Sequence, residues 1–258
     1  MDLKSYLSSE LGEASEEEIK RLSEIEYALE MQHSIVAGDD GDVLKEVRLS
    51  VRDFNEKFSR DYDRAQLCED RLKNRTFFLG VVSILIRKEM SQTEKKKLII
   101  DGGCSTGIDL GFLGMKNPHI GFVGYDISLP SVRQANERLK KLKVKNVDVI
   151  VADHDNLPFR EETANLIYLQ RSFGEEEKFV QDFYSRYDGH HTDRAKKFGS
   201  CLKKDGCMTF TYQNFGEMYP TAMARCFADG MANCSGLKRE YVDMEDAEFF
   251  VMTFKKPR

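Results

Sequence analysis

The stretch LIIDGGCSTG, Leu98–Gly107, decides how the rest of the chain is interpreted. Three apolar residues lead into Asp101, and three of the next six residues are glycines. A buried strand that ends in an acid and turns through glycines is typical of a nucleotide-binding site, because glycine lets the backbone approach a ligand closely. Several chemistries share this opening, so the flanking sequence has to separate them.

The composition is that of an ordinary globular protein. The chain has 258 residues, of which 41% are hydrophobic and 32% charged, with a net charge of −5. This length suits one sizeable α/β domain with an appendage, or two small domains. The acidic balance gives no overall electrostatic footprint for nucleic acid.

Neither a membrane span nor a metal site is expected. The longest apolar run, Phe77–Ile86, has ten residues and contains two small ones, so it predicts a buried helix. The first residues, MDLKSYLSSELGE, lack the apolar core of a secretory signal. The six cysteines form no CxxC pair and have no histidines at metal-ligand spacing, which indicates reduced thiols and a cytoplasmic protein.

Two regions differ in pattern. Residues 1–90 predict helices, with a capping box at Ser15–Glu18 and an apolar stripe from Leu44 to Tyr62. We interpret 1–90 as an N-terminal helical cap or lid and 91–258 as the main domain, with a soft boundary because no linker separates them.

From Lys95 onward, short apolar segments alternate with helices. Strand-like segments occur at 96–101, 119–126, 147–153, 165–170 and 207–212, and 237–255 predicts two closing strands around Met244-Glu245-Asp246. Ser128 is placed to cap a helix between the second and third strands. Near-continuous apolar runs predict a parallel sheet covered on both faces. The predicted fold is therefore α/β, a doubly wound, mostly parallel seven-stranded sheet with helices on both faces.

The residues of the glycine loop distinguish between the candidate cofactors. A phosphate-binding P-loop needs Gly-Lys-Ser/Thr, but Gly107 is followed by Ile108 and Asp109. A dinucleotide fingerprint needs glycine where Cys104 stands. The remaining order is strand, Asp, x, Gly, Cys, small residue, Thr, Gly.

With this order of residues after the strand, the chain resembles the class I S-adenosylmethionine-dependent methyltransferases. The family motif D-x-G-C-G-T-G is similar to Asp101–Gly107, and YDIS (125–128), ADHDNLPF (152–159) and LKKDG (202–206) are similar to its later motifs. The resemblance covers 95–212 clearly. It departs from the family at Ser105, which replaces the middle glycine, while Cys104 is interpreted as a small buried residue and not a nucleophile.

The resemblance implies S-adenosylmethionine as the cofactor and no metal. Asp126 would hold the ribose hydroxyls, since a carboxylate can accept two hydrogen bonds from vicinal hydroxyls, and Asp153 with its neighbour would face the adenine. The residues expected to bind the cofactor are Asp101, Gly102, Gly103, Cys104, Ser105, Gly107, Asp126, Ile127, Ala152, Asp153, His154 and Gln170.

No catalytic residue is diagnostic. Methyl transfer from an activated sulfonium relies largely on positioning. LQRSF (169–173) lacks the Pro-Pro-aromatic motif of amino-directed nucleic-acid enzymes and the Pro-Cys of pyrimidine carbon-5 enzymes. Candidate bases are His190 and His191 in the long segment 171–194, and Tyr62 lies in a segment, 54–65, that resembles the lid helix of small-molecule enzymes.

The predicted activity is methyl transfer to an oxygen or nitrogen atom of a small or medium-sized acceptor. The alternatives are an RNA or protein methyltransferase, or a non-catalytic relative, for which Ser105 and Asn165 (where the family often has aspartate) are the evidence. A nicotinamide dehydrogenase would need glycine at Cys104. Nucleic acid is not expected as a partner. The lysine runs lie before the first strand, at the end of the helix before the third strand and around the helix before the fifth strand, mostly at the end of the sheet away from the ligand loops. The segment 173–187 is instead rich in aromatic residues, which suit a partly apolar pocket. The oligomeric state stays open.

Overall fold

The computed structural model of the protein describes residues 3–11, 69–90, 97–170, 189–213, 232, 236–246 and 249–257. Its helices are α1 (Leu3–Leu11), α4 (Glu69–Met90), α5 (Ile108–Lys116), α6 (Leu129–Lys141) and α8 (Gly189–Cys201), with a short 3₁₀ turn η1 (His154–Asn156). Its strands are β1 (Leu98–Gly102), β2 (Gly121–Asp126), β3 (Val147–Val151), β4 (Ala164–Leu169), β5 (Leu202–Gln213), β6 (Lys238–Asp246) and β7 (Phe249–Lys255).

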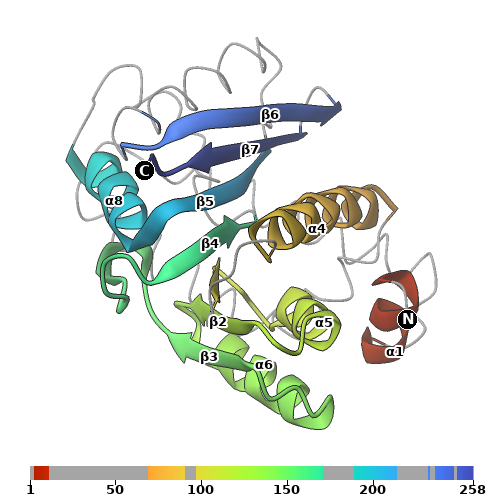
Figure 1. Ribbon diagram of the computed structural model, residues 1–258. Helices are drawn as coiled ribbons and strands as arrows, with labels where there is room; N and C mark the ends of the chain where they lie inside the picture. The colour runs from red at the N-terminus through yellow and green to blue at the C-terminus, as the bar shows by residue number, and fades with distance from the viewer. Residues whose placement is uncertain are drawn as a thin grey trace, which may run out of the picture.

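The strands form one sheet in the order β3-β2-β1-β4-β5-β7-β6 (Figure 1). The neighbours from β3 to β5 pair in parallel, whereas β7 is antiparallel to both β5 and β6. The predicted α/β, doubly wound and mostly parallel sheet is therefore confirmed. The chain runs outward from β1 to β3 and then returns to β4, so the order reverses between β1 and β4. In open sheets of this kind, ligands bind outside the carboxyl ends of the strands at such a point.

Both faces of the sheet are covered. One hydrophobic cluster joins the sheet to α1, α4, α5 and α6, and a second joins the opposite face to α8 (Figure 1). The strands from β1 to β4 are accordingly apolar along most of their length, and every residue of β4 is buried. The predicted buried helix around Phe77–Ile86 is the middle of α4, where Phe78, Val82 and Ile86 are buried.

Helix α6 begins as the sequence predicts. The Ser128 hydroxyl accepts a hydrogen bond from the backbone N–H of Ser131 at 3.3 Å, and Pro130 occupies the first turn, where its missing N–H has no helical partner to lose. Val132, Ala135 and Leu139 form the buried side of the helix. The helix thus starts at the edge of the sheet where β2 ends.

Two strands are longer than the sequence predicts. The predicted turn at Met244-Glu245-Asp246 is wrong, because β6 continues through Asp246 and pairs there with β7. β5 begins at Leu202 and so includes the segment LKKDG, ahead of the strand predicted at 207–212. Asp205 has a φ of 62° there, and the pairing between β4 and β5 shifts register opposite this segment. A bulge therefore absorbs the turn-forming residues without ending the strand.

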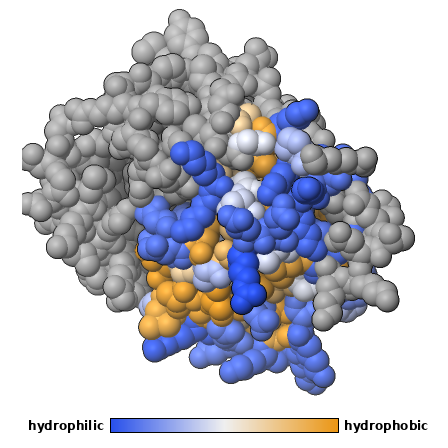
Figure 2. Space-filling view, turned by 60° about the vertical axis from the view of Figure 1, so that its left-hand side comes forward, coloured by the Kyte–Doolittle hydropathy of each residue, from blue (hydrophilic) through white to orange (hydrophobic). Residues whose placement is uncertain are grey.

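The surface mixes both kinds of side chain. On the face drawn in Figure 2, hydrophobic residues gather in a patch among hydrophilic ones, as on most globular proteins. Within the described part of the chain, none of the helices combines the length and apolar character that a membrane crossing needs.

Candidate cofactor site at the carboxyl ends of the strands

The glycine loop folds back over the end of β2. The backbone N–H groups of Gly103 and Cys104 both donate to the Tyr125 carbonyl, at 2.8 and 3.0 Å. Gly103 and Gly107 have φ angles of 70° and 71°, in the left-handed region that glycine adopts without strain. The loop therefore needs glycine at these positions to make its turn.

Two glycines also fit against neighbouring side chains. A Cβ at Gly102 would lie 2.6 Å from the Tyr125 hydroxyl oxygen and would also collide with Leu169. A Cβ at Gly107 would lie 2.8 Å from the Ala135 Cβ, so the loop packs directly on α6. The space that a side chain at Gly102 would need is already filled by Leu169 and Tyr125, so this glycine is required for packing.

The Asp126 carboxylate joins the loop to α6. One oxygen accepts from the Ser105 N–H at 2.8 Å and the other from the Ser128 N–H at 2.8 Å. Burial raises the pKa of Asp126 above its ordinary value, and the backbone N–H groups of Ser128, Ser105 and Ile127 oppose that rise. Each carboxylate oxygen keeps a lone pair, so the group can still accept hydrogen bonds from two ligand hydroxyls.

The segment after β3 adds a second polar group at this edge. The Ala152 N–H donates to the Asp126 carbonyl at 3.0 Å. The Asp153 carboxylate caps η1 by accepting from the Asp155 N–H at 3.1 Å. The His154 ring is held in place by two contacts: its Nδ1 lies 2.7 Å from the Tyr125 hydroxyl, and the ring packs on Phe198.

Asp101 is buried on the face of the sheet that α4 and α5 cover. It is 3% exposed and sits in register with Tyr168 of β4. Burial raises its pKa well above the ordinary value, and the neighbouring Asp109 carboxylate adds to the rise. Asp109 is paired with Arg75 of α4 at 2.6 Å, so a buried group of charges lies behind the glycine loop.

Apolar side chains flank Asp126. Ile127, the next residue, is 53% exposed. Val151, which pairs in register with Asp126 from β3, is 50% exposed. Leu129, in the first turn of α6, is 40% exposed. A polar carboxylate beside exposed apolar groups suits a ligand with one polar and one flat apolar part. Val151 and Leu129 were not predicted as site residues, although their apolar character at the strand end and helix start was the available signal.

The structure brings most of the predicted residues to one edge. Residues 101–107, Asp126 with Ile127, 152–154 and Gln170 lie at or directly after the carboxyl ends of β1 to β4, which share that edge. His190 and His191 begin α8, which ends directly before β5 and so starts at the same edge. Tyr62 and residues 171–188 lie outside the described residues. Among the residues that are described, no group of three metal-binding side chains comes together.

Residues 93–247, more than half of the chain, match the protein family described as "Methyltransferase domain". No curated protein matches the chain. Among solved structures, the [4+2]-cyclase SpnF is similar at a TM-score of 0.53 and 13% identity, covering 69% of this chain and 81% of that one. A putative sarcosine dimethylglycine methyltransferase from Galdieria sulphuraria reaches 0.51 at 12% identity, covering 69% and 86%. Geranyl diphosphate C-methyltransferase from Streptomyces coelicolor A3(2) reaches 0.50 at 12% identity, covering 69% and 79%.

At these identities the solved structures show likeness of fold, and the family match is independent of them. The strand order, the glycine loop and the acid after β2 agree with the motifs noted in the sequence. The chain belongs to the methyltransferase domain family and has the class I methyltransferase fold.

Proposed function

We propose that the protein is an S-adenosylmethionine-dependent methyltransferase that transfers the methyl group to an oxygen or nitrogen atom of a small or medium-sized acceptor. The observation that carries this proposal is the Asp126 carboxylate, which fixes the glycine loop through the Ser105 N–H and retains lone pairs at the carboxyl edge. A similar solved structure holds S-adenosyl-L-homocysteine, the demethylated cofactor, which is consistent with this proposal.

The residues present fit S-adenosylmethionine. Asp126 would accept hydrogen bonds from the ribose hydroxyls, and the exposed Ile127 side chain offers an apolar surface for the adenine. The loop backbone from Gly103 to Ser105 would lie along the methionine part. When bound, this cofactor supplies a methyl group on a positively charged sulfur, which an acceptor atom can attack directly.

The contribution of the chain is positional. When a methyl group is already activated, most of the rate enhancement comes from holding the two reacting atoms together. This lowers the barrier by ~7–11 kcal/mol in favourable cases. The described helices of residues 1–90, α1 and α4, pack with α5 and α6 against one face of the sheet. We propose that His190 or His191, at the start of α8, accepts a proton where the acceptor carries one. The acceptor is a small molecule in this proposal, with no metal required.

A different reaction on the same fold is the second candidate. SpnF is a [4+2]-cyclase by name, and fold alone does not determine chemistry. The evidence for a non-catalytic relative is weaker, because the Asn165 side chain accepts from the Leu98 N–H at 3.1 Å at the opposite, amino edge of the sheet. A panel of small hydroxyl, amine and thiol acceptors, RNA and protein, assayed with labelled methyl donor, separates these alternatives.

The test of the cofactor site is calorimetric titration with S-adenosylmethionine and S-adenosylhomocysteine. We expect binding without added metal, and Asp126→Ala should weaken it by roughly 1.5–3 kcal/mol for each hydrogen bond lost to the charged group. Asp126→Asn, which keeps one acceptor oxygen and the shape, should lose less. A ligand that lacks the ribose hydroxyls should lose less affinity on Asp126→Ala than S-adenosylhomocysteine does, because only the effect of Asp126 on the loop remains.

Absence of binding by the folded parent protein would refute the proposed function. Unchanged affinity of the Asp126→Ala protein would show instead that the ribose lies elsewhere. Circular dichroism at the titration temperature checks that each variant is folded, since Asp126 also holds the start of α6.

A further inference from the structure

Helix α1 contacts the backbone directly after the glycine loop. The Tyr6 hydroxyl donates to the Ile108 carbonyl at 3.1 Å, and its side chain is fully buried. The hydroxyl fills the space that a side chain at Gly111 would occupy, and its ring packs on Phe112 at 5.6 Å between centroids. Burial raises the pKa of Tyr6 well above its ordinary value, so the hydroxyl keeps its proton.

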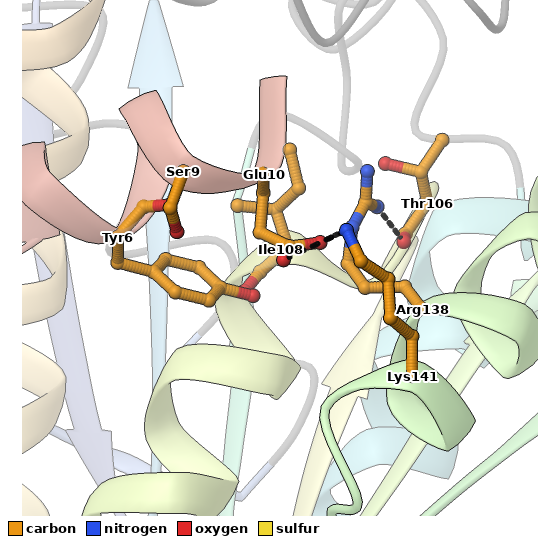
Figure 3. A network of polar contacts seen from close by, with 7 residues as sticks. All are labelled: Tyr6, Ser9, Glu10, Thr106, Ile108, Arg138 and Lys141. Carbon is orange, nitrogen blue, oxygen red and sulfur yellow. Dashed lines mark hydrogen bonds and ion pairs between the residues drawn. The ribbon is translucent and has the colours of Figure 1, made fainter. Parts of the chain in front are cut away.

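A second contact reaches the loop through α6. The Glu10 carboxylate, only 6% exposed, lies 3.4 Å from the Arg138 Nε, and Nη1 of the same guanidinium donates to the Thr106 carbonyl (Figure 3). Lys141 also pairs with Glu10 at 3.4 Å, but it is 69% exposed and makes no hydrogen bond to the loop. A buried carboxylate on α1 is thus linked through one arginine to the loop backbone.

The two carbonyls lie on either side of Gly107, whose φ of 71° sets the turn from the loop into α5. The Asp126 carboxylate holds the Ser105 N–H of the same loop. The loop is therefore held at Ser105 by Asp126, at Thr106 by Arg138 of α6, and at Ile108 by Tyr6 of α1. Burying a carboxylate costs free energy that apolar packing would not, so this polar linkage is expected to specify geometry and not to add stability.

We propose that α1 is a positioning element of the cofactor site: Tyr6, and Glu10 acting through Arg138, hold the carbonyls of Ile108 and Thr106 and keep the glycine loop in its binding conformation. The anchoring of the loop stands on the contacts alone, whereas its effect on affinity rests on the proposed function. Neither residue touches the expected ligand, so both act through the loop.

The test compares Tyr6→Phe, which removes only the hydroxyl, and Glu10→Gln, which removes the charge, with the control Lys141→Gln, which removes the partner of Glu10 that does not reach the loop. Hydrogen exchange of the ligand-free protein and calorimetric affinity for S-adenosylhomocysteine are measured well below the unfolding temperature. We expect faster exchange confined to 102–112 and an affinity about two- to tenfold lower, the equivalent of one hydrogen bond, in both test variants. The control should match the parent in both measurements.

A merely structural role for α1 would instead speed exchange across the sheet or leave the affinity unchanged, and either result overturns the proposal. An equal effect in Lys141→Gln overturns it too. If Glu10→Gln fails to fold, Tyr6→Phe carries the test alone. Should the parent not bind the ligand, the proposed function fails, and local exchange in 102–112 still decides whether α1 anchors the loop.

Discussion

Ser105 adopts a backbone conformation that favours glycine. Its φ of 48° lies in the left-handed region, where a Cβ costs about 1–2 kcal/mol. The family motif has glycine at this position, so the departure noted in the sequence has a cost in the structure. The N–H of Ser105 is nevertheless held by Asp126, which shows how one hydrogen bond helps to maintain a strained residue.

We therefore predict that Ser105→Gly is more stable than the parent. Relief of the strain minus the added entropy of the unfolded chain should leave a gain of about 0.5–1 kcal/mol in the free energy of unfolding, measured by urea denaturation. Its affinity for S-adenosylhomocysteine should be at least that of the parent. Ser105→Ala, which keeps the Cβ, should show no such gain, and Ser105→Leu should stay folded but lose binding. Equal binding by the leucine variant would mean that the loop does not face the ligand.

At the scale of elements, the sequence predicts what local pattern and burial determine. Strands β1 to β4 were recognisable because a sheet covered on both faces needs near-continuous apolar runs. The Ser128 cap was recognisable because its hydrogen bond joins residues three positions apart. The site residues at the strand ends followed from the same reasoning, since parallel strands bring their carboxyl ends to one edge.

The contacts between elements had no comparable signal. The Tyr6 hydrogen bond joins residues 102 positions apart, and the Arg75–Asp109 pair joins residues 34 apart. No periodicity within one helix specifies which residue of another helix it meets. The turn expected within 244–246 failed for a related reason, because backbone pairing with β7 overrode the local turn preference.

The packing of α4 and α5 over β1 predicts a pH dependence. Asp101 is protonated more readily when folded, because burial and the Asp109 charge raise its pKa well above the ordinary value. Below the unfolded pKa both states are neutral at this residue; as pH rises, the unfolded state releases its proton first, so stability falls until the folded pKa is passed. Asp101→Asn should thus gain stability relative to the parent as pH rises from the unfolded pKa, about 3.9, toward the higher folded pKa.

Urea unfolding of both proteins across that range measures the difference. Asp148→Asn, a change of the same charge at an exposed position on β3, is the matched control and should show a much smaller trend. A stability difference for Asp101→Asn that does not change with pH, or that falls as pH rises, would mean that the carboxyl group is not buried as described.

At the scale of the whole molecule, the described lysine clusters lie away from the candidate site. Lys97 precedes β1, α6 ends at Lys141 with Lys143 and Lys145 after it, and Lys203 and Lys204 begin β5. Because these positions lie at the amino ends of parallel strands, they form the edge opposite the glycine loop. Near the loop edge, the Lys197 ammonium donates to the Asp155 carbonyl at 3.0 Å and is held by the protein itself.

The last prediction is that the protein does not bind RNA as its acceptor. A surface that tracks a phosphate backbone needs several basic side chains along one face, and each phosphate contact releases counterions and makes binding steeply dependent on salt. With a net charge of −5 and its described lysine clusters at the far edge, the chain should bind single-stranded RNA no more tightly than roughly 10⁻⁵ M at physiological salt. Fluorescence anisotropy of labelled RNA at several salt concentrations measures this, with S-adenosylhomocysteine present so that the cofactor site is filled. Submicromolar binding that weakens steeply with salt would contradict the small-molecule acceptor and favour the RNA alternative, since only phosphate contacts produce that dependence.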